Sequence, residues 1–571
     1  MAKRVGPYTV TFQDETTRRL KTLQQARDEA ERLLGEFLTN LSGNRGKVLS
    51  LAAPPGLGKT HIAVQVVNKL TEAGHLAKGD VVWFAPRHDM FCAVPDQNEG
   101  KGWVHIRGRR PENCIHSGIA DSLGYKHYGI KNLLCAKCEK HGDCDYFDQF
   151  KSPGHKFDMF QHLWSPYHIN VSVVILDDFD PATYFLEYVG QGLSQDDLRA
   201  WAGAHPFGEV LRALADTMKS LGGDTLAGRA LYDSLAKLTD LKAGLSGGRL
   251  PAVPKSLRKV AGVEQLEAAV TSVSPNFVKS LYSVMAYEVG QRSEGQDFNP
   301  RLTLTANGLH LRLRRELPDW VKSKPVILLN ATPNEGLEGM LFGGMEFLPR
   351  FCPKVAFPSD LVRIKAYTDR LIGKGGLSNP DFCQRVVNDV AELLEEVRAE
   401  DHQYNERALK AIADTSDEEA KRFWRDKPPI KVGVICHKDI ESEIDAQAKP
   451  DVIGYFWANR GSNEFKDCDA LLVVGTPIPH LDSFVEDARA LYWDRPRLDE
   501  REWKVAQMGG NYYFKPSSPL RWLMKAKRED ELYQSVFRIR PLGVLDPKGR
   551  RYGRQLKVYI FSSLPIPGLG V

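Results

Sequence analysis

A glycine-rich segment near the start of the chain carries residue types that bind nucleotide phosphates. It reads AAPPGLGKT and matches the phosphate-loop pattern, except that Ala53 stands where the first glycine is expected. In this pattern Gly56 and Gly58 allow backbone N–H groups to surround the phosphates at the start of a helix. Lys59 neutralises phosphate oxygens, and the hydroxyl of Thr60 binds Mg²⁺. The segment therefore predicts a site for ATP and Mg²⁺; the alternative is a glycine-rich turn that only caps a helix.

Two adjacent carboxylates end an apolar run that provides the second half of such a site. The run VSVVILDDFDP covers residues 171–181, and Asp177 is the residue expected to hold the Mg²⁺ ion. Asp178 is placed to orient or deprotonate a water molecule that attacks the terminal phosphate. The alternative is a buried strand followed by an aspartate that caps a helix. Together with the phosphate loop, the two carboxylates predict ATP hydrolysis.

Four cysteines lie between these two motifs with a spacing that suits a metal centre. They are Cys114, Cys135, Cys138 and Cys144. The chain has nine cysteines in all, and a small, odd number does not favour a disulfide framework. Four thiolates suit either zinc or a four-iron four-sulfur cluster, and residue types and spacing leave both open. Three nearby histidines are alternative zinc ligands, namely His116, His127 and His141.

The elements that must position these motifs alternate between apolar strands and amphipathic helices, which indicates an α/β fold with parallel sheets. The phosphate loop joins a strand to a helix within residues 47–70. The series continues through residues 80–90, 171–181, 324–336, 431–439, 460–479 and 531–543. An amphipathic helix is expected at 23–38, and a second is expected from the helical spacing of Val386, Val390, Leu393, Leu394 and Val397.

One long region departs from this alternation. Residues 186–295 are predicted to be mostly helical, with periodic apolar segments that glycine and proline interrupt. The following residues, 301–314, alternate apolar and polar side chains on both sides of Asn307 and Gly308. Such a pattern predicts a two-residue β-hairpin.

The composition and charge of the chain bear on its location and on its binding partners. The 571 residues are 42% hydrophobic, and no stretch approaches the roughly 20 apolar residues of a membrane span. The first residues lack the apolar core of a secretory signal, so we expect a cytoplasmic protein.

The net charge of +4 is too small to indicate a nucleic-acid partner by itself, although Arg107, Arg109 and Arg110 are candidates to line the path of a strand. Three tryptophans are candidates either for base stacking or for the core, namely Trp83, Trp103 and Trp457.

The order of the motifs resembles that of superfamily 2 helicases, and the position of the cysteines resembles the XPD/DinG (Rad3-like) iron–sulfur family. AAPPGLGKT is similar to motif I, FAPRH to motif Ia and DDFD to motif II. NATP lies where motif III is expected, RGSNEF resembles motif V and QSVFRIR resembles motif VI. HIRGRRPENC is similar to the lead-in to the first cluster cysteine, and the cysteines fall between motifs Ia and II, where this family inserts its cluster domain.

The resemblance implies two RecA-like P-loop motor domains with a Cys-rich metal-cluster insertion and a mostly helical arch-like insertion. The implied segments are 1–95 (motor domain 1, first part with the P-loop), 96–160 (iron–sulfur module with four cysteines), 161–185 (motor domain 1, motif II), 186–295 (helical arch-like insertion), 296–339 (motor domain 1, hairpin and motif III) and 340–571 (motor domain 2).

The activity that the resemblance implies is that of an ATP-dependent DNA helicase. It would move 5′ to 3′ on single-stranded DNA and split forked DNA at a module that a [4Fe–4S] cluster stabilises, with Cys114, Cys135, Cys138 and Cys144 as the cluster ligands. Motor domain 2 would contact ATP through Gln534, Arg538 and Arg540, with Arg538 preferred as the arginine finger. Motif V would couple the strand to the nucleotide through Gly461, Ser462 and Asn463.

The chain departs from the family pattern in two motifs. Asp178 and Asp180 stand where the family usually has glutamate and histidine, and Phe537 replaces the glycine of motif VI. The arginines of motif VI are also more closely spaced than usual. An alternative function is therefore an ATP-driven nucleic-acid-binding switch or remodelling ATPase that does not unwind, with zinc in place of the cluster. A protein partner of such a switch is not identified by the sequence.

Overall fold

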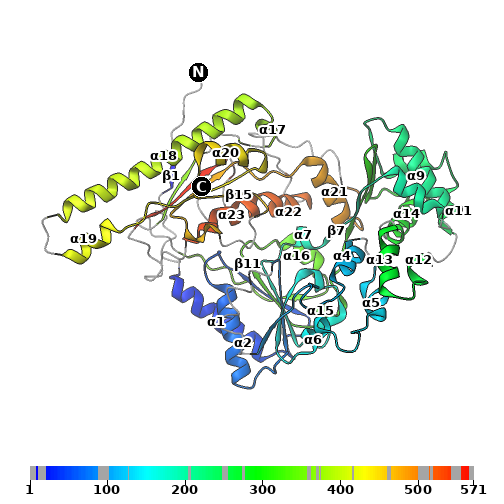
Figure 1. Ribbon diagram of the computed structural model, residues 1–571, viewed down its shortest axis with the longest axis horizontal. Helices are drawn as coiled ribbons and strands as arrows, with labels where there is room; N and C mark the ends of the chain where they lie inside the picture. The colour runs from blue at the N-terminus through cyan, green and yellow to red at the C-terminus, as the bar shows by residue number, and fades with distance from the viewer. Residues whose placement is uncertain are drawn as a thin grey trace.

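The computed structural model describes most of the chain. The described residues are 8–10, 21–87, 90, 102–125, 128–203, 207–246, 255–272, 277–355, 362–367, 372, 374–413, 417–458, 464–498, 514, 518–541, 554–562 and 564. Two mainly parallel β-sheets lie side by side, and a third, smaller sheet with several helices lies at one end (Figure 1). The predicted α/β class with parallel sheets is confirmed.

The first parallel sheet carries the phosphate loop. Its strand order is β12-β2-β11-β6-β3-β5-β4. The strands are β2 (Lys47–Ala52), β3 (Val81–Ala85), β4 (Trp103–His105), β5 (His155–Met159), β6 (Val173–Asp177), β11 (Val326–Asn330) and β12 (Glu346–Phe347). Helices α1 (Leu23–Thr39) and α2 (Lys59–Glu72) pack against each other and share an apolar core with one face of the sheet. The central strands are buried on both faces, which explains their unbroken apolar runs.

The second sheet contains five strands in parallel and one antiparallel edge strand. Its order is β1-β13-β17-β16-β14-β15. The strands are β1 (Tyr8–Val10), β13 (Val362–Ala366), β14 (Val432–Cys436), β15 (Val452–Tyr455), β16 (Ala470–Val474) and β17 (Leu556–Phe561). Although the sequence assigned residues 8–10 to the first motor domain, β1 pairs with β13 of this second sheet. Residues 531–543 were expected to continue the strand series, but their described part forms helix α23 (Asp530–Val536) and the short helix η10 (Phe537–Ile539), which pack on this sheet.

A third sheet, antiparallel throughout, belongs to the region between motifs II and III. Its order is β7-β10-β9-β8, formed by β7 (Leu186–Leu193), β8 (Thr225–Ala227), β9 (Leu302–Thr305) and β10 (Gly308–Arg314). The predicted hairpin is β9–β10, and its turn is Ala306 and Asn307, one residue earlier than expected, because Gly308 already pairs with Thr305. The hairpin joins β7 and β8 instead of the parallel sheet.

The predicted helical content of this region is also present. Its helices are α8 (Gln195–Ala202), α9 (Gly208–Ser220), α10 (Gly228–Leu235), α11 (Leu241–Ser246), α12 (Lys255–Arg258), α13 (Val263–Ser272) and α14 (Val278–Ser293). We call these helices and the third sheet the inserted region. The cysteine segment contributes α4 (Ser117–Tyr125), α5 (Ile130–Leu133), η3 (Cys135–Lys137) and α6 (Asp145–Lys151). Helix α4 packs on α13, so the cysteine segment and the inserted region share one apolar core.

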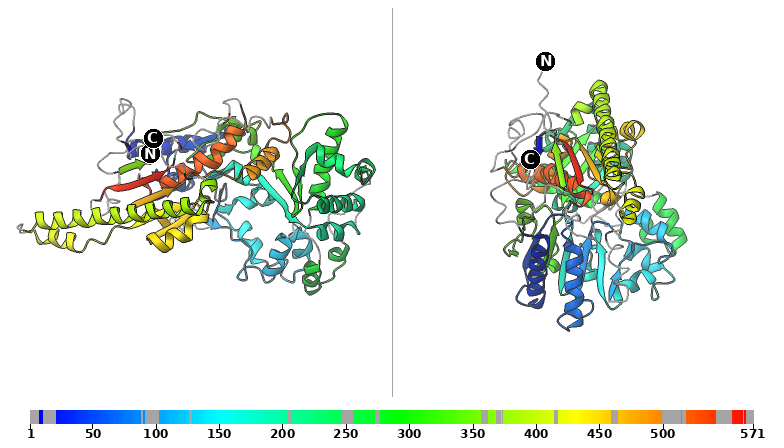
Figure 2. Two further views of the ribbon diagram at one scale, coloured as in Figure 1. Left: turned by 90° about the horizontal axis from the view of Figure 1, so that it is seen from above. Right: turned by 90° about the vertical axis from the view of Figure 1, so that its left-hand side faces the viewer.

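A long helical arm projects from the second sheet. Helix α18 (Pro380–Ala411) and helix α19 (Glu418–Arg425) extend away from the rest of the molecule (Figures 1 and 2). The predicted apolar face of α18 is buried as far as Val397. Asp401 then joins the arm to the domain, because the guanidinium of Arg554 donates to both of its carboxylate oxygens at 2.9 and 2.8 Å.

The remaining helices connect these units. They are η4 (Phe160–His162), η5 (Pro166–His168), α7 (Pro181–Tyr184), α15 (Asp319–Lys322), α16 (Glu335–Leu341), α17 (Lys374–Leu377), η6 (Lys438–Ile440), α20 (Glu441–Ala448), η7 (Glu464–Asp467), α21 (Leu481–Leu491), α22 (Leu520–Met524) and the π-helical turn η9 (Lys525–Glu529). Within the described residues, no helix has both the length and the apolar character that crossing a membrane requires.

Candidate nucleotide site between the two parallel sheets

The phosphate loop joins the carboxyl end of β2 to the first residue of α2. Gly56 and Gly58 both have φ of 91°, a conformation that glycine adopts without the steric cost of a Cβ atom. Gly58 is also the residue that precedes the helix, so the first N–H groups of α2 have no partner within the helix. The loop has the backbone shape that anion binding at a helix N-terminus requires.

Lys59 lies inside this loop. Its ammonium group donates to the carbonyl oxygen of Ala53 at 2.6 Å. Burial lowers the pKa of Lys59 to about 8, although the nearby carboxylates of Asp177 and Asp178 oppose this shift. A polyanion bound in the loop would favour the charged lysine, so phosphate binding and protonation of Lys59 support each other.

Thr60 and Asp177 meet although 117 positions separate them in the sequence. The Thr60 hydroxyl donates to the Asp177 carboxylate at 2.7 Å, because the neighbouring strands β11 and β6 bring the end of β6 beside the loop. Burial raises the pKa of Asp177 to about 6, and the hydrogen bond from Thr60 partly offsets this. A hydroxyl and a carboxylate held together in this way are suitable ligands for Mg²⁺.

The next two aspartates have different local roles. Asp178 has a φ of 52°, which is unusual for a residue with a side chain, and its N–H donates to the carbonyl oxygen of Leu329 at 3.0 Å. Asp180 caps helix α7, accepting hydrogen bonds from the Ala182 N–H and the Thr183 hydroxyl. The helix-capping alternative therefore applies to Asp180, while Asp178 is held in a strained conformation beside Asp177.

The second sheet contributes a helix that faces the first. Gln534 on α23 donates from its side-chain amide to the hydroxyl of Thr332 at 3.4 Å, and Arg538 donates to the Gln534 carbonyl at 3.3 Å. These two residues of motif VI therefore lie together at the junction of the two units. Arg540 has a φ of 53° at the end of η10, where Asp467 of the same unit is a charged neighbour.

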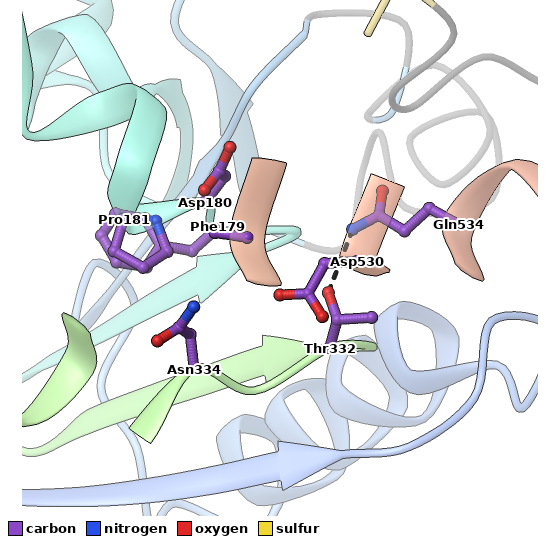
Figure 3. Close-up of a pocket in the computed structure, with 8 residues that line it drawn as sticks. Phe179, Asp180, Pro181, Thr332, Asn334, Asp530 and Gln534 are labelled. Carbon is purple, nitrogen blue, oxygen red and sulfur yellow. Dashed lines mark hydrogen bonds between the residues drawn. The ribbon is translucent and has the colours of Figure 1, made fainter. Parts of the chain in front are cut away.

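A small pocket marks this junction (Figure 3). Its lining combines motif II, motif III and the segment around α23, through Phe179, Asp180, Pro181, Thr332, Asn334, Ala526, Asp530 and Gln534. Burial raises the pKa of Asp530 to about 7, and its ion pair with Lys525 at 2.6 Å partly offsets this.

Two hydrogen bonds join the two sides next to the pocket. The Asn334 amide donates to the carbonyl oxygen of Trp522, and Lys525 donates to the carbonyl oxygen of Pro333. Sequence reasoning missed Lys525, Asn334 and Asp530, since their significance comes from contact across the junction. Two of them had a sequence signal, because Asn334 directly follows NATP and Lys525 begins the basic run KAKR.

The four cysteines lie in short turns of the cysteine segment. Cys135 begins η3, Cys138 directly follows it, and Cys144 precedes α6. Burial raises the pKa of the Cys114 and Cys135 thiols, and for both thiols the Cys144 sulfur adds to this increase. The four sulfurs therefore lie near enough to one another to interact electrostatically.

Among the described residues of the cysteine segment, one set of three possible metal ligands lies together. Zinc bound to sulfur at about 2.3 Å requires tetrahedral sulfur atoms about 3.8 Å apart. No three of the four cysteine sulfurs lie within 4.8 Å of one another among the described residues, whereas His116, Cys138 and Glu139 do. His116, Cys138 and Glu139 thus lie at a spacing that a single metal ion could bridge. His127 lies outside the described residues.

Arg109 is half-buried and contacts one of the cysteines. Its guanidinium donates to the Cys135 sulfur at 3.8 Å and lies 3.9 Å from the centre of the Tyr146 ring. Arg107 and Arg110 are exposed and remain candidates for contact with a strand. Arg109 instead provides positive charge beside the Cys114 and Cys135 thiols, which partly offsets the rise in their pKa that burial causes.

The three tryptophans that are candidates for base stacking differ in their exposure to solvent. Trp83 and Trp103 are buried, and the Trp103 ring stacks on Phe157 with centroids 4.2 Å apart. Trp457 is 42% exposed. Motif V residues Gly461, Ser462 and Asn463 lie outside the described residues.

Comparisons with known proteins gave distant likenesses only. No protein-family model and no curated protein matches the chain. Among solved structures it is similar to a "Truncated XPD", at 12% identity and a TM-score of 0.32, over 56% of this chain and 98% of that one. It is also similar to the Mycobacterium smegmatis helicase Lhr bound to ssDNA and AMP-PNP (11% identity, TM-score 0.29) and to T. fusca Cas3 (10%, 0.25), each over 96% of this chain and 48% of the other. The chain thus spans about half the length of these two proteins.

Proposed function

We propose that the chain is an ATP-driven nucleic-acid motor of the helicase type. The observation that carries this proposal is the meeting of Lys59, Thr60 and Asp177 at the edge of one parallel sheet, opposite the Gln534 helix of the other. Phosphates would lie on the loop glycines and Lys59, and Thr60 with Asp177 would hold Mg²⁺. Asp178, which follows Asp177 and lies near Lys59, would orient the attacking water.

The division of the site between two units gives hydrolysis a mechanical consequence. Lys59 and Asp177 belong to the first sheet, while Gln534 and Arg538 belong to α23 and η10 on the second. ATP that contacts both sides would favour a closed arrangement, and the loss of the terminal phosphate would remove part of that preference. A strand held by both units would then advance with each cycle.

In finer terms, we propose a DNA helicase that moves 5′ to 3′ on single-stranded DNA and opens a fork at the cysteine segment. Cys114, Cys135, Cys138 and Cys144 would hold a structural [4Fe–4S] cluster, which would supply a rigid cross-link between short turns. The position of the four cysteines between motifs Ia and II supports this assignment, and zinc is the alternative. The polarity follows from the sequence resemblance.

The test combines ATP hydrolysis with strand displacement. We expect single-stranded DNA to stimulate hydrolysis, a 5′-tailed fork to be unwound, and Lys59→Ala to abolish both. Unchanged hydrolysis by Lys59→Ala would show that the site lies elsewhere. Purification without oxygen, followed by iron and zinc analysis and an absorption spectrum, tests the cluster separately.

A second candidate is a nucleic-acid-dependent ATPase switch that does not unwind. The strained Asp178, with a carboxylate one methylene shorter than glutamate, favours slow turnover in such a switch. ATPase stimulation by DNA without any displacement of a forked strand would select this second candidate.

A further inference from the structure

Trp457 combines three properties that the stability of the fold does not explain. It is 42% exposed, it lies two residues beyond β15, and its φ is 67°. A bulky residue at positive φ has a steric cost that glycine would avoid. Since the ring is only partly buried, its packing does not offset this cost well, and such strain is typical of functional positions.

The Trp457 ring is held in a fixed position. Its backbone N–H donates to the Glu531 carboxylate at 2.5 Å, and its indole N–H donates to the carbonyl oxygen of Lys527 at 3.2 Å. The neighbouring Phe456 ring is buried, with centroids 6.2 Å apart in an edge-to-face arrangement. A ring that is already ordered loses little conformational entropy when it stacks on a ligand.

The surroundings suit a polyanion with flat bases. Strands β14 and β15 are parallel, so Trp457 and the exposed Lys438 both follow the carboxyl ends of neighbouring strands. The ammonium group of Lys438 lies 5.3 Å from the centre of the Tyr455 ring, two residues before Trp457. A positive charge and an exposed aromatic ring at the same end of neighbouring strands form a combination that binds single-stranded nucleic acid.

We propose that Trp457 stacks on a base of a bound single strand. The inference rests on the proposed motor function and adds a strand-contacting residue to it. Glu531, which fixes Trp457, lies on α23 together with Gln534. One helix therefore holds both the stacking ring and a residue of the nucleotide junction, so a shift of α23 would move the base contact.

The experiment measures binding of a labelled oligothymidylate by fluorescence anisotropy. We expect Trp457→Ala to weaken binding by about 5- to 100-fold, and Trp457→Phe to retain most of the affinity. Phe423→Ala is the matched control, because Phe423 is also 42% exposed but lies on the distant helix α19, and its binding should equal that of the unmodified chain. Trp457→Gly should keep or raise the thermal midpoint, because glycine relieves the strain.

A second oligonucleotide, with abasic sites in place of its bases, separates stacking from phosphate contact. The unmodified chain and Trp457→Ala should bind it equally. The inference is wrong if Trp457→Ala binds oligothymidylate as the unmodified chain does, if it weakens binding to both oligonucleotides equally, or if it changes only the KM for ATP. A chain that binds no oligonucleotide overturns the motor proposal and this inference together, whereas DNA-stimulated hydrolysis with unchanged Trp457→Ala binding overturns the inference alone.

Discussion

The buried carboxylate of Asp177 beside the phosphate loop lowers the free energy of unfolding when it is ionised. Asp177 is almost fully buried, and its pKa is raised to about 6 from the 3.8 of an exposed aspartate. The unfolded chain loses this proton at lower pH than the folded chain does. Ionised Asp177 therefore reduces stability increasingly as pH rises from 3.8 to 6, and the full penalty applies above that range.

Removing this charge should stabilise the protein and abolish its activity. We expect Asp177→Asn to raise the free energy of unfolding by roughly 1–2 kcal/mol at about pH 7.5, less than the full shift represents because the attraction to Lys59 is lost too. The gain should shrink as pH falls below 6, and ATP hydrolysis should be lost. Denaturant unfolding at several pH values checks this; a gain that does not change with pH would contradict the electrostatic explanation.

Arg109 allows a residue-level test of the cysteine centre. Its guanidinium contacts the Cys135 sulfur, so Arg109→Gln removes a positive charge from beside the thiols. We expect this variant to contain at least two-fold less metal per chain after purification without oxygen, measured by elemental analysis. Arg110→Gln is the control, because Arg110 is exposed, and equal metal content in both variants would refute the role of Arg109.

Among the elements, helix α16 sets how closely the two units approach. Gly336 lies against the Trp522 indole of α22, and a Cβ atom at Gly336 would come within 2.2 Å of that ring. The contact requires glycine at this position, since an added methyl group would force the helices apart. The small residue is therefore part of the junction beside Asn334.

We expect Gly336→Ala to destabilise the closed arrangement of the two units, because its methyl group clashes with the Trp522 ring. A loss of about 1.4 kcal/mol would reduce ATP turnover by about ten-fold. Gly339→Ala, in the same helix but with no atom within 4 Å of its added methyl group, should keep normal turnover. Steady-state ATPase rates measure both. Normal turnover by Gly336→Ala would indicate that the junction adjusts without functional loss.

At the scale of the whole molecule, the inserted region contacts helix α21, which follows strand β16 of the second parallel sheet in the chain. Asp487 on α21 accepts hydrogen bonds from Arg312 of β10 and Tyr188 of β7, and Lys527 lies 2.7 Å from its other oxygen. Lys527 belongs to η9, which directly precedes α23. The inserted region is thus in contact with the segment that leads to the nucleotide junction.

This arrangement predicts that unwinding and hydrolysis can be separated. Arg312→Ala should reduce displacement of a forked strand at least five-fold while DNA-stimulated ATPase activity falls less than two-fold, because it removes the contact with α21 but no residue of the site. Arg315→Ala is the control, since its guanidinium contacts Glu187 and the Trp164 ring instead of α21. Equal loss of both activities by Arg312→Ala would show general destabilisation instead.

Much of the plan of the molecule was predictable from local sequence. The central strands of both parallel sheets are unbroken apolar runs, because both of their faces are buried. Helix α1 has an amphipathic pattern, because only one of its faces is buried. The segment around Gln534 was placed among the strands but is helical, since short buried strands and buried helices have similar apolar runs. The projecting arm was not anticipated, because only the first half of α18 has an apolar face to pack.

The sequence by itself determined the chemistry that the chain can present: a phosphate loop, paired carboxylates and four cysteines. Local backbone rules also required glycine at Gly56 and Gly58. Only the tertiary structure decided that Thr60 meets Asp177, that Gln534 meets Thr332, and that Trp457 is exposed while Trp83 is buried. The physical reason is that residue types and periodicity are local properties, whereas the pairing order of strands and the contact between two packed units depend on the whole chain.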